Sequence, residues 1–341
     1  MGSVMLIQKL KTHIKTVLIK LMREKRKFSN YSHQLYTKDI SYEIDMLLLP
    51  SFLREIEGPN FKQKYLNLIK GLDDESILTV ARIISRALLL RNFRGGYIDF
   101  FSREEKEILD FLKYEYRPSF IKLEEGLFCY KGWLFPSDHV SPCAAYYEHF
   151  LGDLSSLSDI SQKCIIDAGA FIGDSALFMS PYTAKQIFAF EPGRDNYELL
   201  QKTIELNGLS NVIPVNFGLG EREESINITK DLSASRCTNN AASNTETANI
   251  TTLDDFVEKN SLDVGLIKVD VEGFERALLK GAVRTIKIQK PTLLLSIYHS
   301  GGDFFDIKKM IEDLDLGYRF KIKQQFAGSI LAETLLIAET F

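Results

Sequence analysis

Cysteine is scarce in this chain. Its 341 residues include 4 cysteines, Cys129, Cys143, Cys164 and Cys237, and no two of them form a Cys-x-x-Cys pair. Disulfide frameworks and structural zinc sites need more cysteines at closer spacing. We therefore expect neither of them, and we expect a protein that works in a reducing cytoplasm.

The sequence also lacks long hydrophobic runs and an excess of positive charge. No apolar segment approaches the about 20 residues that span a bilayer, and the net charge is −4 at pH 7. This balance argues against nucleic acid as a partner. A hydrophobic content of 45% is ordinary for a globular protein, and the length leaves room for two domains.

Residues 1–28 differ in charge from the rest of the chain. Apolar residues recur at helical spacing between positions 5 and 27, where one acid, Glu24, stands among eight basic residues: Lys9, Lys11, Lys15, Lys20, Arg23, Lys25, Arg26 and Lys27. A basic amphipathic helix of this kind is typical of contact with the anionic inner face of a membrane or with an acidic partner. A terminal helix packed on its own domain with a solvated basic face would give the same pattern. Both interpretations stay open.

Residues 29–125 form a second region, with a helical pattern from about 39 to 113 and no chemical motif. Residues 126–135 then predict a hairpin of two aromatic strands around Lys131-Gly132. Ser141-Pro142 opens a short helix, which either walls a ligand site or simply packs on the edge of the following sheet. The third region, 126–341, contains the motifs that carry chemistry.

The central motif of the third region is a buried strand followed by a glycine turn. The apolar run 164–168 is too short for a helix and ends near Asp167, and the chain then turns through Gly169 and Gly173 into a helical pattern from Asp174. Glycines at a strand-to-helix turn let the backbone approach a ligand closely. A second buried run, 186–191, ends in Glu191, and an acid in that position can accept hydrogen bonds from ribose hydroxyls.

The glycine spacing is not that of a dinucleotide site, which would read Gly-x-Gly-x-x-Gly. Here Asp167 precedes the first glycine, so a pyrophosphate would be repelled while a cationic amino-acid ligand would be favoured. S-adenosylmethionine carries an ammonium, a sulfonium and a ribose without phosphate, and it is the cofactor that the motif predicts. The alternative is an ordinary glycine turn with two solvated acids.

Further strands and helices alternate along the rest of the chain. Strands are expected at 212–217, 264–270 and 291–298, a side strand at 225–229, helices at 195–207, from 252 and at 304–314, and a terminal hairpin at 318–323 and 329–338. Residues 231–249, rich in Ser, Thr and Asn, predict a long loop. The pattern indicates an α/β fold with a doubly wound, mostly parallel, seven-stranded Rossmann-like sheet. The strands at 164–168 and 264–270 should be neighbours, with the ligand at their carboxyl ends.

Four motifs carry a family resemblance. Asp-x-Gly-Ala-x-x-Gly-Asp-Ser at 167–175, Phe-Glu-Pro at 190–192, Thr-Leu-Asp-Asp at 252–255 and Lys-Val-Asp-Val-Glu-Gly-Phe-Glu at 268–275 occur in this order. With them, residues 126–341 resemble the FkbM family of S-adenosylmethionine-dependent methyltransferases. The resemblance implies an O-methyltransferase that acts on a sugar hydroxyl of a lipopolysaccharide, capsule or other surface glycan, or on a polyketide.

The resemblance also implies site residues. The cofactor's methionine part would lie among Asp167, Gly169, Phe171, Gly173, Asp174 and Ser175, its ribose on Glu191, and its adenine near Asn216 and Gly218. The transferred methyl group and the acceptor would meet at Asp270 and Glu272, with His299 facing the same cleft. We expect His299 to be the general base, because an imidazole accepts a hydroxyl proton near neutral pH. A divalent metal held by Asp270, Glu272 and a further Asn or Asp is the alternative.

Two other functions compete with O-methylation of a glycan. N-methylation of a glycan-linked amine or amide would use the same site. A non-catalytic adaptor, tethered to a membrane by residues 5–27, would be expected to have a degenerate glycine motif or to lack Glu191, and both are intact.

Overall fold

A seven-stranded sheet forms the centre of the computed structural model, which describes residues 42–92, 100–229 and 245–340. The strand order is β12-β13-β11-β10-β4-β5-β6. The neighbours from β11 to β6 pair in parallel, whereas β13 runs antiparallel to both β11 and β12. The strands are β4 (Cys164–Ala168), β5 (Ile187–Phe190), β6 (Val212–Val215), β10 (Val264–Val269), β11 (Thr292–Ser296), β12 (Arg319–Gln324) and β13 (Thr334–Glu339). The predicted fold class is confirmed, and β4 and β10 are neighbours as expected.

The central strands are apolar because both faces of the sheet are covered. Every residue of β4, β10 and β11 is buried, as in parallel sheets with helices on each side. Alternate residues of β4 serve two separate cores: Ile165 packs in one and Ile166 in the other. The covering helices are α8 (Asp174–Met179), α9 (Arg194–Asn207), α10 (Leu253–Lys259), α11 (Glu275–Lys280), α12 (Val283–Gln289) and α13 (Gly301–Glu312).

The helices begin and end where local signals place them. The side chain of Thr252 caps the first turn of α10 by accepting from the backbone N–H of Asp255, and Ser300 caps α13 in the same way. Helix α9 ends at Gly208, which has φ +61° as the C-terminal glycine of a helix requires. These observations confirm the helices predicted after positions 195 and 252.

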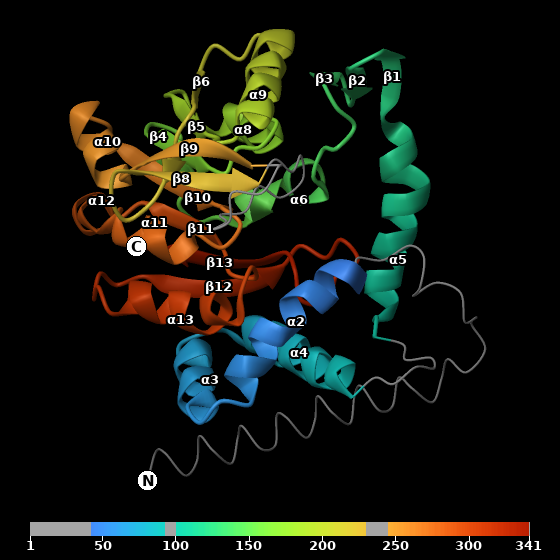
Figure 1. Cartoon of the computed structure of the whole chain (residues 1–341), viewed down its shortest axis with the longest axis vertical. Helices are drawn as coiled ribbons and strands as arrows, with labels where there is room; N and C mark the ends of the chain where they lie inside the picture. The colour runs from blue at the N-terminus through green and yellow to red at the C-terminus, as the bar shows by residue number, and fades with distance from the viewer. Residues whose placement is uncertain (1–41, 93–99, 230–244, 341) are drawn as a thin grey trace.

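Three helices near the amino terminus cover one edge of the sheet: α2 (Tyr42–Ile56), α3 (Phe61–Ile69) and α4 (Asp74–Arg91). Figure 1 shows α2 and α3 in blue and α4 in teal, below β12 and α13. The ring of Phe52 in α2 lies 5.2 Å from that of Phe304 in α13, and Ser76 in α4 accepts a hydrogen bond from the backbone of Ile322 in β12. The helical pattern is confirmed over these residues. The basic segment 5–27 lies outside the described residues.

Helix α5 (Arg103–Phe111) runs along one side of the molecule toward a small antiparallel sheet (Figure 1). That sheet consists of β1 (Ile121–Glu124), β2 (Leu127–Tyr130) and β3 (Trp133–Phe135). Strands β2 and β3 are the predicted hairpin, with Tyr130 opposite Trp133.

A third sheet corrects one prediction. It contains β7 (Gly218–Leu219), β8 (Glu224–Thr229) and β9 (Thr245–Thr251), so residues 245–249 form a strand and not a loop. The segment alternates, with Ala248 and Ile250 buried and Thr247 and Asn249 exposed, and threonine favours strands. The polar composition of the segment hid this alternation of buried and exposed positions from the sequence analysis. The remainder of the predicted loop, 230–244, lies outside the described residues.

A second correction concerns the last strand of the chain. It begins at Thr334 and not at Ser329, and residues 329–333 form a loop before it.

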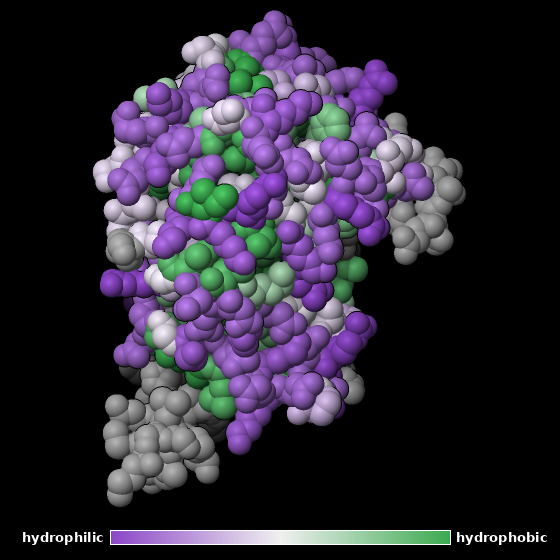
Figure 2. Space-filling view, turned by 90° about the vertical axis from the view of Figure 1, so that its left-hand side faces the viewer, coloured by the Kyte–Doolittle hydropathy of each residue, from purple (hydrophilic) through white to green (hydrophobic). Residues whose placement is uncertain are grey.

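One face of the molecule mixes polar and apolar residues. On the face in Figure 2, small groups of apolar residues lie among hydrophilic ones. Within the described ranges, no helix combines the length and the apolar character needed to cross a bilayer.

Candidate active site

A cavity of about 310 Å³ opens at the carboxyl ends of β4, β5 and β10, where the topology predicted a ligand site. Eight of the twelve predicted site residues line it: Gly169, Phe171, Asp174, Ser175, Glu191, Gly218, Asp270 and Glu272. Asp167, Gly173, Asn216 and His299 do not line it, and each lies behind a lining residue or in the backbone turn. The motifs around the glycine turn and after β10 are therefore brought together.

The glycine turn is required by the close approach of two strand ends. Gly169 has φ +79°, and a Cβ atom there would lie 1.8 Å from the carbonyl oxygen of Asp270. Gly173 has φ +86° at the start of α8, and its Cβ would lie 2.8 Å from the side chain of Leu200. At position 169 only glycine combines a positive φ with the absence of a Cβ atom that would collide with Asp270. The turn thus holds the ends of β4 and β10 against each other beside the cavity.

Glu191, at the end of β5, is held by backbone donors. Its carboxylate accepts hydrogen bonds from the N–H groups of Phe171 and Gly193, each at 3.0 Å, and it is 5% exposed. Burial raises the pKa of Glu191 to about 7. Asn216 supports this end of the strand from behind, because its amide donates to the carbonyl oxygen of Glu191 at 2.9 Å.

Lys268 and Asp167 form a buried ion pair under the cavity. The distance from Lys268 Nζ to Asp167 Oδ1 is 3.0 Å, and the ammonium also donates to the carbonyl oxygen of Gly169 at 2.8 Å. Burial alone would lower the pKa of Lys268, but the carboxylates of Asp167 and Asp270 outweigh it and raise that pKa. Lys268 lines the cavity as a cation. Asp167 does not line the cavity and affects it only by holding Lys268 in place.

Residues 140–149 form one wall of the cavity. The carboxylate of Asp174 accepts a hydrogen bond from the backbone N–H of Ser141 at 2.8 Å, which ties α8 to the short helix α6 (Pro142–Ala145). Burial raises the pKa of Asp174 to about 6. The ring of His149 lies 2.9 Å, measured from Nε2, from the hydroxyl of Ser175. Of the two interpretations of this segment, the structure supports a wall of the site.

The opposite end of the cavity is acidic. Asp270, Glu272 and Glu333 line it together with Tyr298. Burial raises the pKa of Asp270, and it raises that of Glu333 to about 7. Sequence reasoning missed Glu333, whose carboxylate accepts from the thiol of Cys143 at 3.0 Å.

The loop that carries Glu333 is fixed by an acid far away in the sequence. Asp45 of α2 is 0% exposed and accepts hydrogen bonds from the hydroxyl of Ser329 and from the backbone N–H groups of Ile330 and Leu331. No local pattern joins Asp45 to this loop, because the two lie 284 positions apart. A polar residue within the apolar stripe of α2 was the one available signal.

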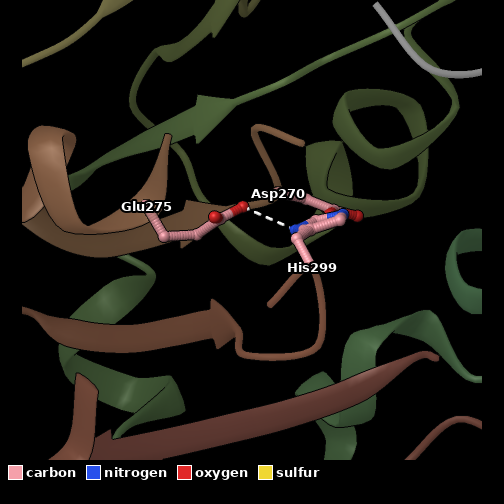
Figure 3. Close-up of side chains that lie close together, drawn as sticks. All are labelled: Asp270, Glu275 and His299. Atoms are coloured by element: carbon pink, nitrogen blue, oxygen red, sulfur yellow. Dashed lines mark hydrogen bonds and ion pairs between the residues drawn. The ribbon is translucent and has the colours of Figure 1, made fainter. Parts of the chain in front are cut away.

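His299 lies among carboxylates (Figure 3). Its Nδ1 is 2.7 Å from Glu275 Oε1, and its Nε2 is 3.5 Å from Asp270 Oδ1 and 3.7 Å from Glu272 Oε2. Burial alone would lower the pKa of His299, but Glu275 and Glu272 raise it well above its usual value. In the metal-free chain Glu275 and Glu272 thus favour the protonated imidazole, and the role of His299 as the base stays a prediction. It lies behind Asp270, not in the cavity lining.

Comparison with known proteins agrees with this arrangement. In the solved structure of an FkbM methyltransferase from Methylobacillus flagellatus, the match has a TM-score of 0.50 at 19% identity and covers 81% of this chain and 58% of that one. The seven-stranded sheet and its covering helices thus have the α/β fold of that methyltransferase. Residues 167–320, a little under half of the chain, match the family model of the methyltransferase FkbM domain.

Two relatives match part of this chain. One is the hexuronic acid methyltransferase AglP of Haloferax volcanii, 29% identical over 152 residues, which are 44% of this chain and 62% of that protein. The other is methyltransferase 1 of Beauveria bassiana, 29% identical over 173 residues, which are 43% of this chain and 70% of the relative. The match spans less than two thirds of the length of the archaeal protein, and neither match includes the whole of this chain.

Proposed function

We propose that this chain is an S-adenosylmethionine-dependent methyltransferase that methylates a sugar hydroxyl of a glycan or glycan precursor. The observation that carries the proposal is the pairing of one buried acid, Glu191, at the cofactor end of the cavity with a separate acidic end at Asp270. The family match at residues 167–320 supports methyl transfer. The archaeal relative, named for a hexuronic acid, supports a sugar acceptor.

The residues of the cavity fit the cofactor. Its volume of about 310 Å³ is at the lower end of small-molecule sites. Glu191 can accept hydrogen bonds from two ribose hydroxyls, and the apolar side chains of Leu219, Ile226 and Ile250 offer a wall for a purine. Among the described residues, Oδ1 of Asn196 is buried in this lining without a hydrogen-bond partner. Lys268 and Asp270 present opposite charges for a zwitterionic amino acid.

When bound, S-adenosylmethionine supplies an electrophilic methyl group. The chain's own residues hold the acceptor and take up its proton. A sugar hydroxyl is a weak nucleophile, and a positioned base near neutral pKa makes it a better one. Asp270 and Glu333 fit this role better than His299, because burial raises the pKa of each toward neutrality and both line the cavity.

The acidic end also gives weight to the second candidate, N-methylation of an amino sugar. Asp270, Glu272 and Glu333 would attract an ammonium group before it loses its proton. The two functions are separated by offering glycosides of a neutral hexose, a hexuronate and an aminohexose with methyl-labelled cofactor. We expect an O-methyl product by nuclear magnetic resonance. An N-methyl product would instead select the second candidate, and absence of transfer to all three would contradict both.

The basic segment 5–27 supports a proposal about location. We infer that it holds the enzyme at the inner face of a membrane, where lipid-linked glycan precursors would be in reach. Its charge of eight basic residues against Glu24 is the support for this proposal. The enzyme itself would act from the cytoplasmic side.

Replacing Glu191 with glutamine is expected to weaken binding of S-adenosylmethionine by about 10- to 100-fold. The reason is the loss of charge-assisted hydrogen bonds to ribose, worth about 1.5–3 kcal/mol. Calorimetry on the full chain measures it, with Glu198→Gln on the exposed face of α9 as the matched control. Equal affinity in wild type and Glu191→Gln would remove Glu191 from the cofactor site.

Cofactor affinity is also expected to depend on pH. Burial raises the pKa of Glu191 from 4.5 to about 7, so at pH 6 the ligand-free protein holds a proton that must leave before two ribose hydroxyls can donate. Binding at pH 6 should be about tenfold weaker than at pH 8, because the ionised fraction falls by that factor. Calorimetry across this range should give a flatter profile for Glu191→Gln.

The raised pKa of Glu191 has the opposite effect on the stability of the ligand-free fold. The folded, ligand-free chain holds a proton on Glu191 that the unfolded chain releases, so this group makes the fold less stable as pH rises from about 4.5 to about 7. Cofactor binding and ligand-free stability should therefore change in opposite directions over this window. Parallel changes would contradict the assignment of the titration to Glu191.

A further inference from the structure

Four side chains meet at the acidic end of the cavity: His299, Glu275, Asp270 and Glu272. The two ring nitrogens of His299 face different carboxylates. His299 is central: Glu275 lies on the side of its Nδ1, while Asp270 and Glu272 lie on the side of its Nε2. Figure 3 shows Glu275 and Asp270 on opposite sides of the ring. The imidazole thus separates one carboxylate from the other two.

The Nδ1 side is fixed. Glu275 is 0% exposed, and its Oε1 accepts from Nδ1 of His299 at 2.7 Å and from the backbone N–H of Val271 at 3.0 Å. A buried carboxylate on one ring nitrogen sets the orientation of the ring and keeps the proton on that nitrogen. Nε2 can then donate its lone pair to a cation, whose binding releases the Nε2 proton to solvent. This is the environment that proteins build around a metal-binding histidine.

The Nε2 side is incomplete. Nε2 of His299 is buried and has no hydrogen-bond partner among the described residues, and the side chain is 4% exposed. The oxygens of Asp270 and Glu272 lie 3.5 and 3.7 Å from it, beyond a good hydrogen bond. Two ligand atoms bound about 2.1 Å from one ion lie about 3–3.5 Å apart. The separation of Asp270 from Nε2 falls in this range and that of Glu272 is slightly longer, so each carboxylate can share a cation with Nε2.

We propose that a divalent cation binds to Nε2 of His299 and to the carboxylates of Asp270 and Glu272, with Glu275 orienting the histidine from behind. The ligand atoms of Asp270, Glu275 and His299 lie within 4.8 Å of one another, which also brings Glu275 close. We assign Glu275 the outer position because its Oε1 holds Nδ1, whereas Asp270 and Glu272 lie on the side of Nε2. Asp270 and Glu272 line the cavity, so an ion can enter from it.

The ligand set favours Mn²⁺ or a similar first-row ion. Carboxylates suit Mg²⁺ and Mn²⁺, whereas an imidazole selects against Mg²⁺. Three protein ligands leave positions open toward the cavity. This part rests on the proposed function: the ion would bind the acceptor hydroxyl there and make it more acidic. Binding of the ion itself does not depend on methyl transfer.

Titration of the chelator-treated full chain with Mn²⁺ alone, followed by electron paramagnetic resonance, tests the site. We expect one Mn²⁺ per chain with a dissociation constant below about 1 mM, typical of a partly open carboxylate site. Glu272→Gln and His299→Gln should abolish saturable binding over this range. Glu275→Gln should weaken it by about 10- to 100-fold, as loss of an outer partner does. Asp263→Asn, at the far end of β10 with a side chain 71% exposed, is the control.

The outcomes separate this proposal from the proposed function. If folded wild type, checked by circular dichroism, leaves the Mn²⁺ signal unchanged, the metal site is overturned and His299 is the cation of an ion-pair cluster. Calorimetry with S-adenosylmethionine on the same sample then reports on the function independently. Binding of Mn²⁺ without binding of the cofactor would contradict the function alone. Should His299→Gln fail to fold, Glu272→Gln decides, because the side chain of Glu272 is 25% exposed and is no part of the hydrophobic core.

Discussion

Replacing Lys268 with methionine is expected to lower the free energy of unfolding by about 3–5 kcal/mol, the usual effect of removing one partner from a buried ion pair. Asp167 is 0% exposed and would keep a carboxylate inside the sheet without the ammonium that lies 3.0 Å away. Gly169 would also lose the donor to its carbonyl oxygen. Urea unfolding at pH 7 measures the change.

The matched control removes both charges. In the double variant Asp167→Asn with Lys268→Met no carboxylate is left unpaired, so it should be more stable than Lys268→Met alone. A loss below about 1 kcal/mol in the single variant would mean that water or another group replaces the ammonium.

Replacing Asp270 with asparagine is expected to lower turnover by about 10²- to 10⁴-fold, the range for a positioned general base. The substitution keeps the shape of the side chain, which lines the cavity beside Tyr298 and faces His299. It removes the charge that would accept the hydroxyl proton or hold a cation. Cofactor affinity should fall much less than turnover, since Lys268 still holds the amino-acid part and Glu191 still holds the ribose.

Initial rates with labelled cofactor measure this effect, and Asp263→Asn again provides the same chemical change at the opposite end of β10. Turnover within a few-fold of wild type would exclude Asp270 from the chemistry. A loss of turnover without loss of Mn²⁺ binding would favour proton transfer over metal ligation.

The parts of the site that could be predicted from the sequence are local. The run 164–168, the glycines at 169 and 173, and Glu191 at the end of the next strand each depend on a few neighbouring residues. The strand Thr245–Thr251 could not be recognised, because its inward positions were obscured by a polar composition. The position of Glu333 in the site depends on contacts between segments far apart in the sequence, and no periodic pattern of residues predicts such contacts.

His299 shows the same limit for chemistry. Its position after β11 was apparent from the sequence, but its protonation depends on Glu275, which reaches it from α11. The motif at 268–275 contains three acids, and only the fold decides which of them face Nδ1 and which face Nε2. The role of a histidine therefore follows from its partners more than from its place in the chain.

The contact between Asp45 and the loop at 329–333 makes α2 part of the site although it lies far outside the matched domain. Three buried donors on that loop depend on one carboxylate, and a buried donor without an acceptor costs about 1–3 kcal/mol. Substitutions in α2 and in the loop will not be additive. By thermodynamic reciprocity, a ligand that orders Glu333 also stabilises the docking of α2, so the amino-terminal helices and the acceptor pocket cannot evolve independently.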